Sequence, residues 1–451
     1  MPDPAAIFKA YDIRGVVPDQ LDEGVARAIG AALVDVLDQP SGVAVGHDMR
    51  ESSPTLAAAF AEGVTSRGVD VVDVGLVSTD ELYFASGRLN LPGAMFTASH
   101  NPPEYGGIKL CRAGAAPIGQ DTGLAEIRAM VERGEVPSGG GASGSVSRQD
   151  LLTAYAEHLL TLVDLSKIRR LKVVVDAGNG MAGLTVPAVF GGLDIELVPL
   201  YFELDGTFPN HVANPIEPEN LVDLQAKVRE VGADVGLAFD GDADRCWVID
   251  ERAESVPPSA ITALIAVREL AREPGATIIH NLITSRAVPE IVREHGGTPI
   301  RDRVGHSFIK ATMAKTGAIF GGEHSAHFYF RDFWRADSGM LAALHTLAAL
   351  GSQDKPLSEL LAAYERYVAS GEINSRVDDQ AGALDRVKAA YAGRDGVTVD
   401  ELDGLTVGDG DWWFNLRPSN TEPVLRLNAE AVDGETMAHV RDEVLGLVQA
   451  R

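Results

Sequence analysis

Short apolar runs alternate with alanine-rich stretches of helical spacing along most of the chain. Residues 42–48 (GVAVGHD) form one apolar run, and the stretch after Ser53 and Pro54 has the spacing of a helix. The same rhythm returns between residues 151 and 245, through LKVVVDAGNG and ADVGLAFDGDADR. It returns again in TIIHNLITSRAV and GAIFGGEHSAHFYF. This alternation predicts three successive parallel β-α-β units.

The rhythm changes from about Gly371 onward. The strand-like runs VTVDELDGLTV, DWWFNL and VLRLNAEA follow one another, with the polar loop RPSNTEP before the last and a helix at the end. Strands without intervening helices predict a small α+β domain. A Gly/Ser-rich tract at residues 138–147 is either a linker between domains or an exposed loop within one, and its composition leaves both open.

Polar residues directly follow the apolar strands in all three predicted units. In parallel sheets the ligand crevice lies beyond the carboxyl ends of the strands, so chemistry is expected at these polar clusters. A length of 451 residues, at about 150 residues per domain, fits three domains or four small ones.

The charge balance excludes some classes of partner. The chain has 39 Lys and Arg against 65 Asp and Glu, a formal net charge of −26 and a pI of about 4.8. Such a surface repels nucleic acid and anionic membranes, so neither is expected as a partner. An anionic substrate would need a site where cations gather locally.

The cysteines and the N-terminus indicate a cytoplasmic protein. Cys111 and Cys246 have no CxxC spacing, so we expect them to be small buried side chains in a reducing compartment. The N-terminal residues lack the basic segment and long apolar run of a signal peptide, and no apolar run reaches membrane-spanning length.

The acidic motif DGDADR at residues 240–245 is the strongest local signal. Asp240, Asp242 and Asp244 at alternate positions would lie on one face of an extended segment, and such carboxylates suit a hard cation such as Mg²⁺. A solvated acidic turn is the simpler alternative. An EF-hand would use Glu251, but Arg245 stands where that loop needs glycine and the apolar run CWVI follows.

Three further polar motifs are weaker when each is taken alone. TASHNPPEYGGIKL places Ser99 beside His100, with Lys109 ten residues on, yet serine in a turn is usually a cap or a surface hydroxyl. GEHSAH at residues 322–327 offers groups that suit vicinal sugar hydroxyls. RPSNTEP at residues 417–423 resembles a phosphate cradle. Both are otherwise ordinary polar loops.

The glycine motif GNGMAG at residues 178–183 favours a different function. It fits GxGxxG after a strand, with Glu203 about twenty residues on, as in a NAD-dependent dehydrogenase. That hypothesis leaves the other four motifs unexplained, so we interpret the motif as a tight strand-to-helix turn.

The order of the motifs resembles that of a known family. FKAYDIRG, the Ser99 loop, DGDADR, GEHSAH and RPSNTEP together look like the α-D-phosphohexomutase family over nearly the whole chain. Within it the chain is most similar to bacterial phosphomannomutase and phosphoglucomutase. Glucosamine mutases typically have glycine at the position of Asn420, and usually GEQSGH where this chain reads GEHSAH.

The resemblance implies a fold of three consecutive mixed or parallel α/β domains plus a smaller C-terminal α+β domain around a central cleft. We expect a phosphoserine-loop domain at residues 1–148 and a metal-binding domain at 149–253. A sugar-binding domain at 254–368 and a phosphate-binding domain at 369–451 would follow. The protein would be a monomer or a weak homodimer.

The resemblance also implies roles for individual residues. Ser99 would be the phosphoserine and would bind Mg²⁺ together with Asp240, Asp242 and Asp244, with Arg245 beside them. Catalytic roles would fall to Lys109, His100, His306 and Arg14. The residues expected to hold substrate are Tyr11, Glu323, Ser325, His327, Arg417, Ser419, Asn420 and Thr421. One departure is Ile283, where some relatives carry lysine; Arg286 or Lys310 would have to supply the missing cation.

These expectations predict a phosphomannomutase that interconverts mannose 1-phosphate and mannose 6-phosphate. The reaction would pass through phosphorylated Ser99 and a hexose 1,6-bisphosphate, which also serves as activator, and glucose phosphates would be accepted too. Alternatives are phosphoglucomutase as the main activity, a glucosamine-phosphate mutase, a NAD-dependent dehydrogenase, or a catalytically dead protein that binds sugar phosphates.

Overall fold

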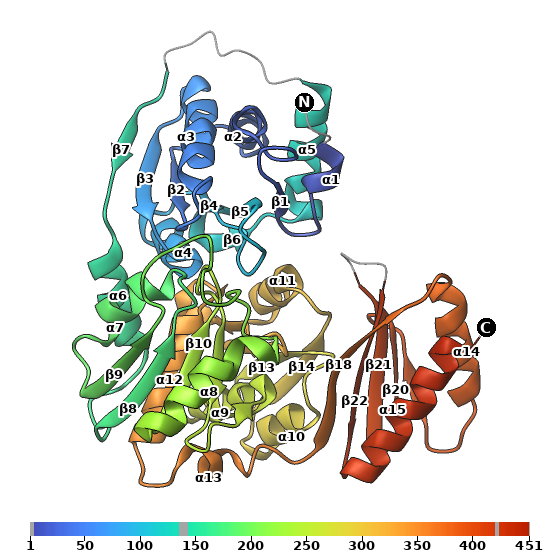
Figure 1. The fold of residues 1–451 in the computed structure, drawn as a ribbon. Helices are drawn as coiled ribbons and strands as arrows, with labels where there is room; N and C mark the ends of the chain where they lie inside the picture. Colours follow the sequence, from blue (N-terminus) through green and yellow to red (C-terminus); the bar gives the residue numbers. More distant parts are fainter. Residues whose placement is uncertain (1–3, 135–142, 420–423, 451) are drawn as a thin grey trace.

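Four β-sheets follow one another along the chain in a computed structural model that describes residues 4–134, 143–419 and 424–450. Figure 1 shows the first sheet and its helices at the top of the molecule, the second and third below it, and the fourth in a separate lobe to the right. Within the described ranges, no helix combines the length and apolarity needed to cross a bilayer.

The first sheet is mixed and has seven strands. They are β1 (Ile13–Val16), β2 (Val43–His47), β3 (Val71–Leu76), β4 (Gly93–Phe96), β5 (Tyr105–Arg112), β6 (Ala116–Pro117) and β7 (Val146–Arg148). Their order is β1-β5-β4-β2-β3-β7, with β6 paired to β5. The flanking helices are α1 (Pro4–Ile7), α2 (Glu23–Val36), α3 (Ser53–Ser66), α4 (Thr79–Leu89) and α5 (Leu124–Arg133).

The strand β7 differs from the expectation of a linker or loop. Val146 and Ser147 end the Gly/Ser-rich tract, yet they pair in parallel with Val71 and Val72 of β3. An edge strand offers unpaired backbone groups to any extended neighbour, and this pairing does not depend on side-chain composition. Val146 stays 57% exposed, which explains why no apolar pattern marked the strand.

The second sheet carries the acidic motif between two antiparallel strands. Its strands are β8 (Leu171–Asp176), β9 (Ile195–Leu200), β10 (Val235–Phe239), β11 (Cys246–Ile249) and β12 (Ser255–Val256), in the order β12-β11-β10-β8-β9. Its helices are α6 (Leu152–Leu162), α7 (Ala182–Phe190) and α8 (Val222–Val231). Strand β10 is buried along its whole length, as a central apolar strand should be. Phe239 pairs with Cys246, so residues 240–245 form the tight reversal between them.

The third sheet repeats this arrangement. Its strands are β13 (Thr277–Asn281), β14 (Thr298–Asp302), β15 (Phe320–Gly322), β16 (Phe328–Phe330) and β17 (Ala336–Asp337), in the order β14-β13-β15-β16-β17. Its helices are α9 (Pro258–Arg272), α10 (Ala287–Glu294), α11 (His306–Thr316), α12 (Gly339–Gly351) and α13 (Leu357–Leu361). Residues 323–327 form the reversal between β15 and β16.

The fourth sheet is antiparallel. It consists of β18 (Val368–Arg376), β19 (Thr398–Asp400), β20 (Leu405–Gly408), β21 (Trp412–Pro418) and β22 (Val424–Ala431), in the order β18-β22-β21-β20-β19, with helices α14 (Gln380–Tyr391) and α15 (Gly434–Gln449). The run VTVDELDGLTV is two strands, because Gly404 turns the chain with φ of +68°. Neither strand β18 nor helix α14 was predicted from the sequence.

The apolar cores show which domains are joined. One continuous cluster includes Leu82 of the first sheet's helices, Leu237 of the second sheet and Phe328 of the third. The C-terminal domain has its own cluster around Phe414 and Val444. Its contacts with the third domain include the Arg286 amide, which donates to Glu430 Oε1 at 3.0 Å. The first three domains therefore form one packed body, and the fourth is a separate lobe.

Candidate functional site

The turn between β4 and β5 places Ser99 against the acidic loop of the second domain. Ser99 is 3% exposed and has φ of +51°, a left-handed conformation that is costly for a residue with a side chain. Its amide donates to Thr97 Oγ1 at 2.9 Å. A Cβ atom at Gly241 would lie 2.4 Å from the Ser99 carbonyl oxygen, so only glycine lets the two loops approach this closely.

The Ser99 hydroxyl points into the acidic loop. Its Oγ donates to Asp240 Oδ2 at 2.8 Å, although 141 residues separate the two. His100 Nδ1 lies 3.2 Å from the same oxygen, and Arg245 Nη2 lies 3.4 Å from it. The structure thus brings together four of the residues proposed from the sequence.

The three aspartates form a buried group that fits a cation. Asp240, Asp242 and Asp244 are at most 1% exposed, and their ligand atoms lie within 4.8 Å of one another. In the described part of the chain, Oδ1 of Asp242 and Oδ1 of Asp244 are buried without a hydrogen-bond donor. Burial, together with the neighbouring aspartates, raises the pKa of Asp240 to about 6. Orphaned carboxylate oxygens of this kind suit Mg²⁺.

Two cations already offset part of this charge. Lys109 Nζ lies 2.7 Å from Asp242 Oδ2 and 2.5 Å from Asp244 Oδ2. Arg245 Nε donates to Asp240 Oδ2 at 2.9 Å. Burial by itself would lower the pKa of Lys109, but the two aspartates raise it overall. Lys109 is therefore an ammonium group, and with Arg245 it offsets part of the negative charge of the three aspartates.

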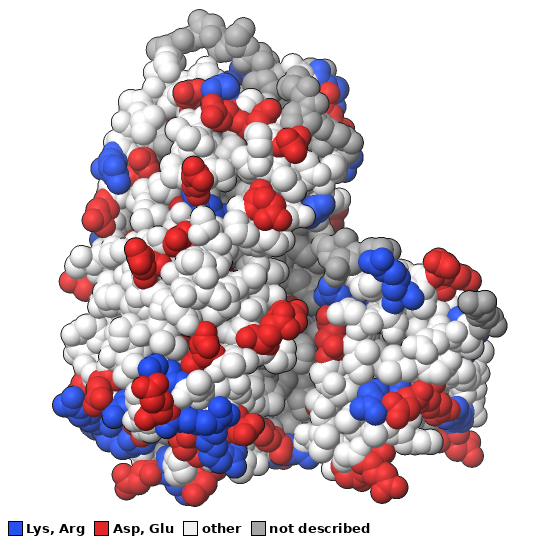
Figure 2. Space-filling model, viewed as in Figure 1, with Lys and Arg blue, Asp and Glu red and all other residues white. Residues whose placement is uncertain are grey.

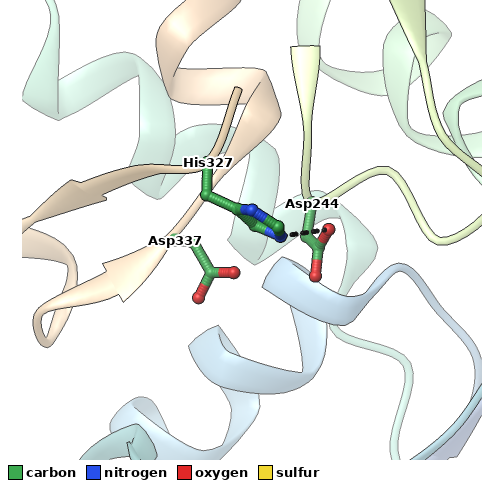
Figure 3. A group of neighbouring side chains, drawn as sticks. All are labelled: Asp244, His327 and Asp337. Carbon is green, nitrogen blue, oxygen red and sulfur yellow. Dashed lines mark ion pairs between the residues drawn. The ribbon is translucent and has the colours of Figure 1, made fainter. Parts of the chain in front are cut away.

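A second group lies on the other side of Asp244, where Figure 3 shows the His327 imidazole pointing toward the Asp244 carboxylate. His327 Nε2 lies 3.6 Å from Asp244 Oδ1, and Asp337 completes a set with ligand atoms within 4.8 Å. Burial opposes the charged imidazole, but contact with Asp244 raises the pKa of His327 overall. Lys310 Nζ lies 2.6 Å from Asp337 Oδ1. The Lys310 ammonium already pairs with Asp337, so these side chains form a network of charged and hydrogen-bonding groups beside the three aspartates.

The GEHSAH motif forms the reversal next to this network. Glu323 is 2% exposed; its Oε1 accepts from the Gly305 amide at 3.0 Å and its Oε2 from the Tyr329 hydroxyl at 2.5 Å. Ser325 Oγ lies 3.0 Å from His327 Nδ1. Glu323 is thus held by two hydrogen bonds, while Ser325 and His327 are more accessible.

Tyr11 and His306 lie where the first domain meets the third, and Arg14 lies beside the Ser99 loop. The Tyr11 and His306 rings meet edge to face with their centroids 5.0 Å apart. Burial lowers the pKa of His306 to about 3, so its imidazole is neutral. Arg14 donates to Asp12 Oδ2 at 2.7 Å and to the Ala98 carbonyl at 3.1 Å, directly before Ser99.

The predicted phosphate cradle lies at the end of β21. Arg417 is 5% exposed, and its Nη2 donates to Glu372 Oε2 of β18 at 3.3 Å. Burial lowers the pKa of Arg417, and the Glu372 carboxylate opposes this shift. The Ser419 amide donates to the Val424 carbonyl at 2.9 Å. Asn420 and Thr421 lie outside the described residues.

Neither candidate for the missing cation at Ile283 stands free. Ile283 is 6% exposed. Arg286 donates to the Gly410 carbonyl at 2.8 Å and so joins the third domain to the fourth. Lys310 is 3% exposed, bound to Asp337, with its Nζ 4.1 Å from the Tyr83 ring centroid.

Two further expectations concern the cysteines and the glycine motif. Cys111 and Cys246 are free and buried, as predicted. The GNGMAG motif is a turn that leads into α7, where a Cβ at Gly180 would lie 2.7 Å from the Gly241 carbonyl oxygen and one at Gly183 would lie 2.2 Å from the Phe202 carbonyl oxygen. Both glycines thus serve close backbone packing.

The start of helix α4 reaches the acidic loop, which sequence reasoning missed. Thr79 Oγ1 donates to Asp242 Oδ2 at 2.6 Å, and the Thr79 amide donates to the Asp242 carbonyl at 3.0 Å. Asp80 accepts from Tyr155 of the second domain and from Ser338 of the third, each at 2.7 Å. The only signal was the polar run STDE directly after the apolar strand β3.

Comparison with known proteins identifies the arrangement. Four family models described as phosphoglucomutase/phosphomannomutase match the chain: the α/β/α domains I, II and III at residues 5–137, 153–253 and 257–367, and the C-terminal domain at 372–447. The chain belongs to the phosphoglucomutase/phosphomannomutase family. Members of this family are phosphohexomutases, which are isomerases, so the chain is an enzyme of that class.

Individual family members agree over nearly their full length. The chain is 44% identical to the "phosphohexose mutases" protein of Xanthomonas campestris, with 97% of each chain covered. It is 41% identical to a phosphomannomutase of Escherichia coli K12, again over 97% of each. A crystal structure of a family member from Burkholderia thailandensis is 37% identical and superposes with a TM-score of 0.90, covering 100% of this chain and 98% of that one. The predicted family and fold class are confirmed.

Proposed function

We propose that this protein interconverts mannose 1-phosphate and mannose 6-phosphate, and also acts on glucose phosphates, through a phosphorylated Ser99. The observation that carries the proposal is the 2.8 Å contact between Ser99 Oγ and Asp240, beside Lys109 and Arg245. A phosphoryl group on that oxygen would lie among two cations and a carboxylate set that fits a metal ion. The relatives named phosphomannomutase support mannose as the preferred sugar.

The reaction consists of two phosphoryl transfers, one from Ser99 to the sugar and one from the sugar back to Ser99. The free hydroxyl of a hexose monophosphate attacks the phosphorus on Ser99, the new P–O bond forms and the P–Oγ bond breaks, which yields an enzyme-bound hexose 1,6-bisphosphate. The bisphosphate then turns by about half a turn and returns its other phosphoryl group to Ser99. Alignment and charge stabilisation supply most of the acceleration in such transfers.

We assign the proton transfer to His100. Its Nδ1 lies 3.2 Å from Ser99 Oγ, and burial, with the nearby Arg245, holds the pKa of His100 well below its usual range. A neutral imidazole can take the proton of the attacking hydroxyl and return it to the serine oxygen once its Nδ1 is released by Arg245 Nη2, which contacts it in this structure. Lys109 is held as an ammonium by two aspartates, so its role is electrostatic.

Asp240, Asp242 and Asp244 would hold Mg²⁺ together with an oxygen of the phosphorylated Ser99. The ion would supply positive charge to the oxygens of the phosphoryl group when bound. Arg245 orients Asp240 through its Nε, and Thr79 holds one oxygen of Asp242.

The substrate would be held at its far end and along its ring. Arg417 and Ser419, with Asn420 and Thr421, would hold the non-reacting phosphate, and Glu323 and Ser325 would hold the 3- and 4-hydroxyls with His327 nearby. Tyr11, Arg14 and His306 would line the cleft. These groups read charge and shape, so they accept either orientation of the bisphosphate. The protein would then distinguish only weakly between the two configurations of the 2-hydroxyl, in which mannose and glucose differ.

The four domains supply these parts in order. We propose that residues 1–148 carry the serine loop, 149–253 the metal loop, 254–368 the sugar loop and 369–451 the phosphate loop. The separate core of the last domain supports its closing over the substrate, which would exclude water from the phosphoserine. Figure 2 shows a notch between this lobe and the rest of the molecule.

A coupled assay with mannose 1-phosphate and glucose 1-phosphate side by side, with Mg²⁺ and trace hexose 1,6-bisphosphate, tests the proposal. We expect turnover with both sugars and a higher kcat/KM for mannose. Ser99→Ala should abolish turnover without changing the thermal unfolding temperature by more than a few degrees. Substantial activity in this variant would contradict the covalent step.

A further inference from the structure

The segment between β2 and α3 buries an arginine against the backbone of the Ser99 loop. Arg50 is 1% exposed, and its two terminal nitrogens face four carbonyl groups of residues 99–105. Nη2 donates to the carbonyls of Ser99 at 2.8 Å and Asn101 at 2.6 Å. Nη1 donates to those of Pro102 at 2.8 Å and Tyr105 at 3.2 Å.

The guanidinium is itself fixed from two sides. Its Nε lies 3.3 Å from Oδ2 of the buried Asp48, which accepts at Oδ1 from the Ser53 hydroxyl at 2.6 Å. The ring of Phe208, from the second domain, lies over the guanidinium with 5.0 Å between its centroid and Cζ. The second domain also approaches at Gly206, where a Cβ would lie 2.6 Å from Arg50 Cα. Arg50 is therefore clamped between its own domain and the next.

We propose that Arg50 is a positioning residue that holds Ser99 in the conformation from which it exchanges the phosphoryl group. Ser99 adopts φ of +51°, and such a conformation persists only when the surrounding structure determines it. Arg50 binds the carbonyl of Ser99 itself and those of three residues that follow. Charge-assisted bonds from a planar guanidinium fix direction as well as distance. This inference rests on the proposed function and adds a residue that does not touch the substrate.

A loosened serine loop should affect transfer more than binding. The groups proposed to hold the sugar and the distal phosphate lie in the third and fourth domains, whereas Arg50 acts only on the loop that carries the reacting oxygen. Displacement of a reacting group by about 1 Å can lower a rate by about 100-fold. A phosphoserine that is poorly aligned with the sugar is also more open to attack by water.

The test compares Arg50→Lys with Arg67→Lys. Lysine keeps the charge, but its single nitrogen cannot span four carbonyls. Arg67 of the same domain pairs with Asp35 at 2.5 Å, so its variant controls for the loss of an arginine–carboxylate pair. The readouts are kcat, KM for mannose 1-phosphate, and the inorganic phosphate released per mutase turnover. This last ratio does not depend on the folded fraction, because only folded molecules contribute to either reaction.

We expect Arg50→Lys to lower kcat by about 100-fold, to change KM by less than about threefold, and to raise the phosphate released per turnover by about tenfold or more. Arg67→Lys should leave that ratio unchanged. If Arg50→Lys does not fold, Phe208→Leu is measured instead, and about a threefold rise in the ratio is expected. An unchanged ratio in whichever variant folds overturns the inference. A wild-type enzyme without mutase turnover would instead overturn the proposed function.

Discussion

Replacing Lys109 by methionine should separate the contribution of its ammonium group to stability from its effect on metal binding. In the native protein this group lies 2.5 to 2.7 Å from two carboxylates that are at most 1% exposed. Removing one partner of a buried ion pair typically costs about 3–5 kcal/mol. At roughly 2–4 °C per kcal/mol, the unfolding temperature should fall by roughly 6–20 °C. Lys172, which is about one third exposed beside Glu196, provides a control whose loss should cost under about 1 kcal/mol.

The same substitution should strengthen metal binding. A cation held by these aspartates would be repelled by the ammonium, and at an effective dielectric constant of about 20 two unit charges about 4 Å apart repel by roughly 4 kcal/mol. We therefore expect Mg²⁺ to bind at least about tenfold more tightly to Lys109→Met than to the wild type. Bound Mg²⁺ should restore much of the stability that the variant loses, while kcat falls by about 100-fold or more.

Isothermal titration calorimetry and thermal unfolding with and without Mg²⁺ measure both effects. The reasoning is refuted if Lys109→Met is as stable as Lys172→Met, or if Mg²⁺ stabilises it no more than it stabilises the wild type. A loss of activity alone would not distinguish the electrostatic role from a local distortion.

Three further predictions use other parts of the structure. Thr79→Val should weaken Mg²⁺ binding severalfold by removing one of the two donors that hold Asp242 Oδ2, and Thr79→Ser should restore it; equal affinities measured by calorimetry would count against this role. Burial, with Asp80 and Asp150 nearby, raises the pKa of Glu81 to about 8 from its ordinary value of 4.5. The protein should therefore have its full stability below about pH 4.5, where Glu81 is neutral in both states, and lose stability as the pH rises through 8. Glu81→Gln should raise the unfolding temperature at about pH 8.5 but not at about pH 4.5, whereas an equal shift at both pH values would rule out titration as the cause. Small-angle scattering should show compaction when hexose 1,6-bisphosphate is added, and an unchanged radius of gyration would argue against domain closure.

The motifs were predictable because each one follows an apolar strand. The buried run VGLAF marks β10, and the acidic residues begin where it ends. The Ser99 loop follows β4 in the same way. Strand ends could therefore be placed from apolar runs alone, and the polar residues after them were correctly expected at one edge of the sheets. Strand β7 could not be placed, because backbone pairing at a sheet edge needs no apolar side chain.

The partners of these motifs could not be predicted, because they come from distant parts of the chain. Thr79 meets Asp242 across 163 residues, and Asp80 meets Ser338 across 258. Periodicity shows which side chains are buried, but not which buried groups touch. A buried arginine such as Arg50 has no distinctive spacing, and only the folded loop shows that its donors meet four carbonyls.

The order of apolar strands and polar loops, which local sequence encodes, determined the α/β class, the family and the residues around which chemistry is expected. Tertiary structure decided the charge state and the geometry of those residues. Burial raises the pKa of Asp240 and lowers that of His306, while paired aspartates keep Lys109 charged. These effects depend on desolvation and on distances of a few ångströms between domains, and neither quantity exists until the chain has folded.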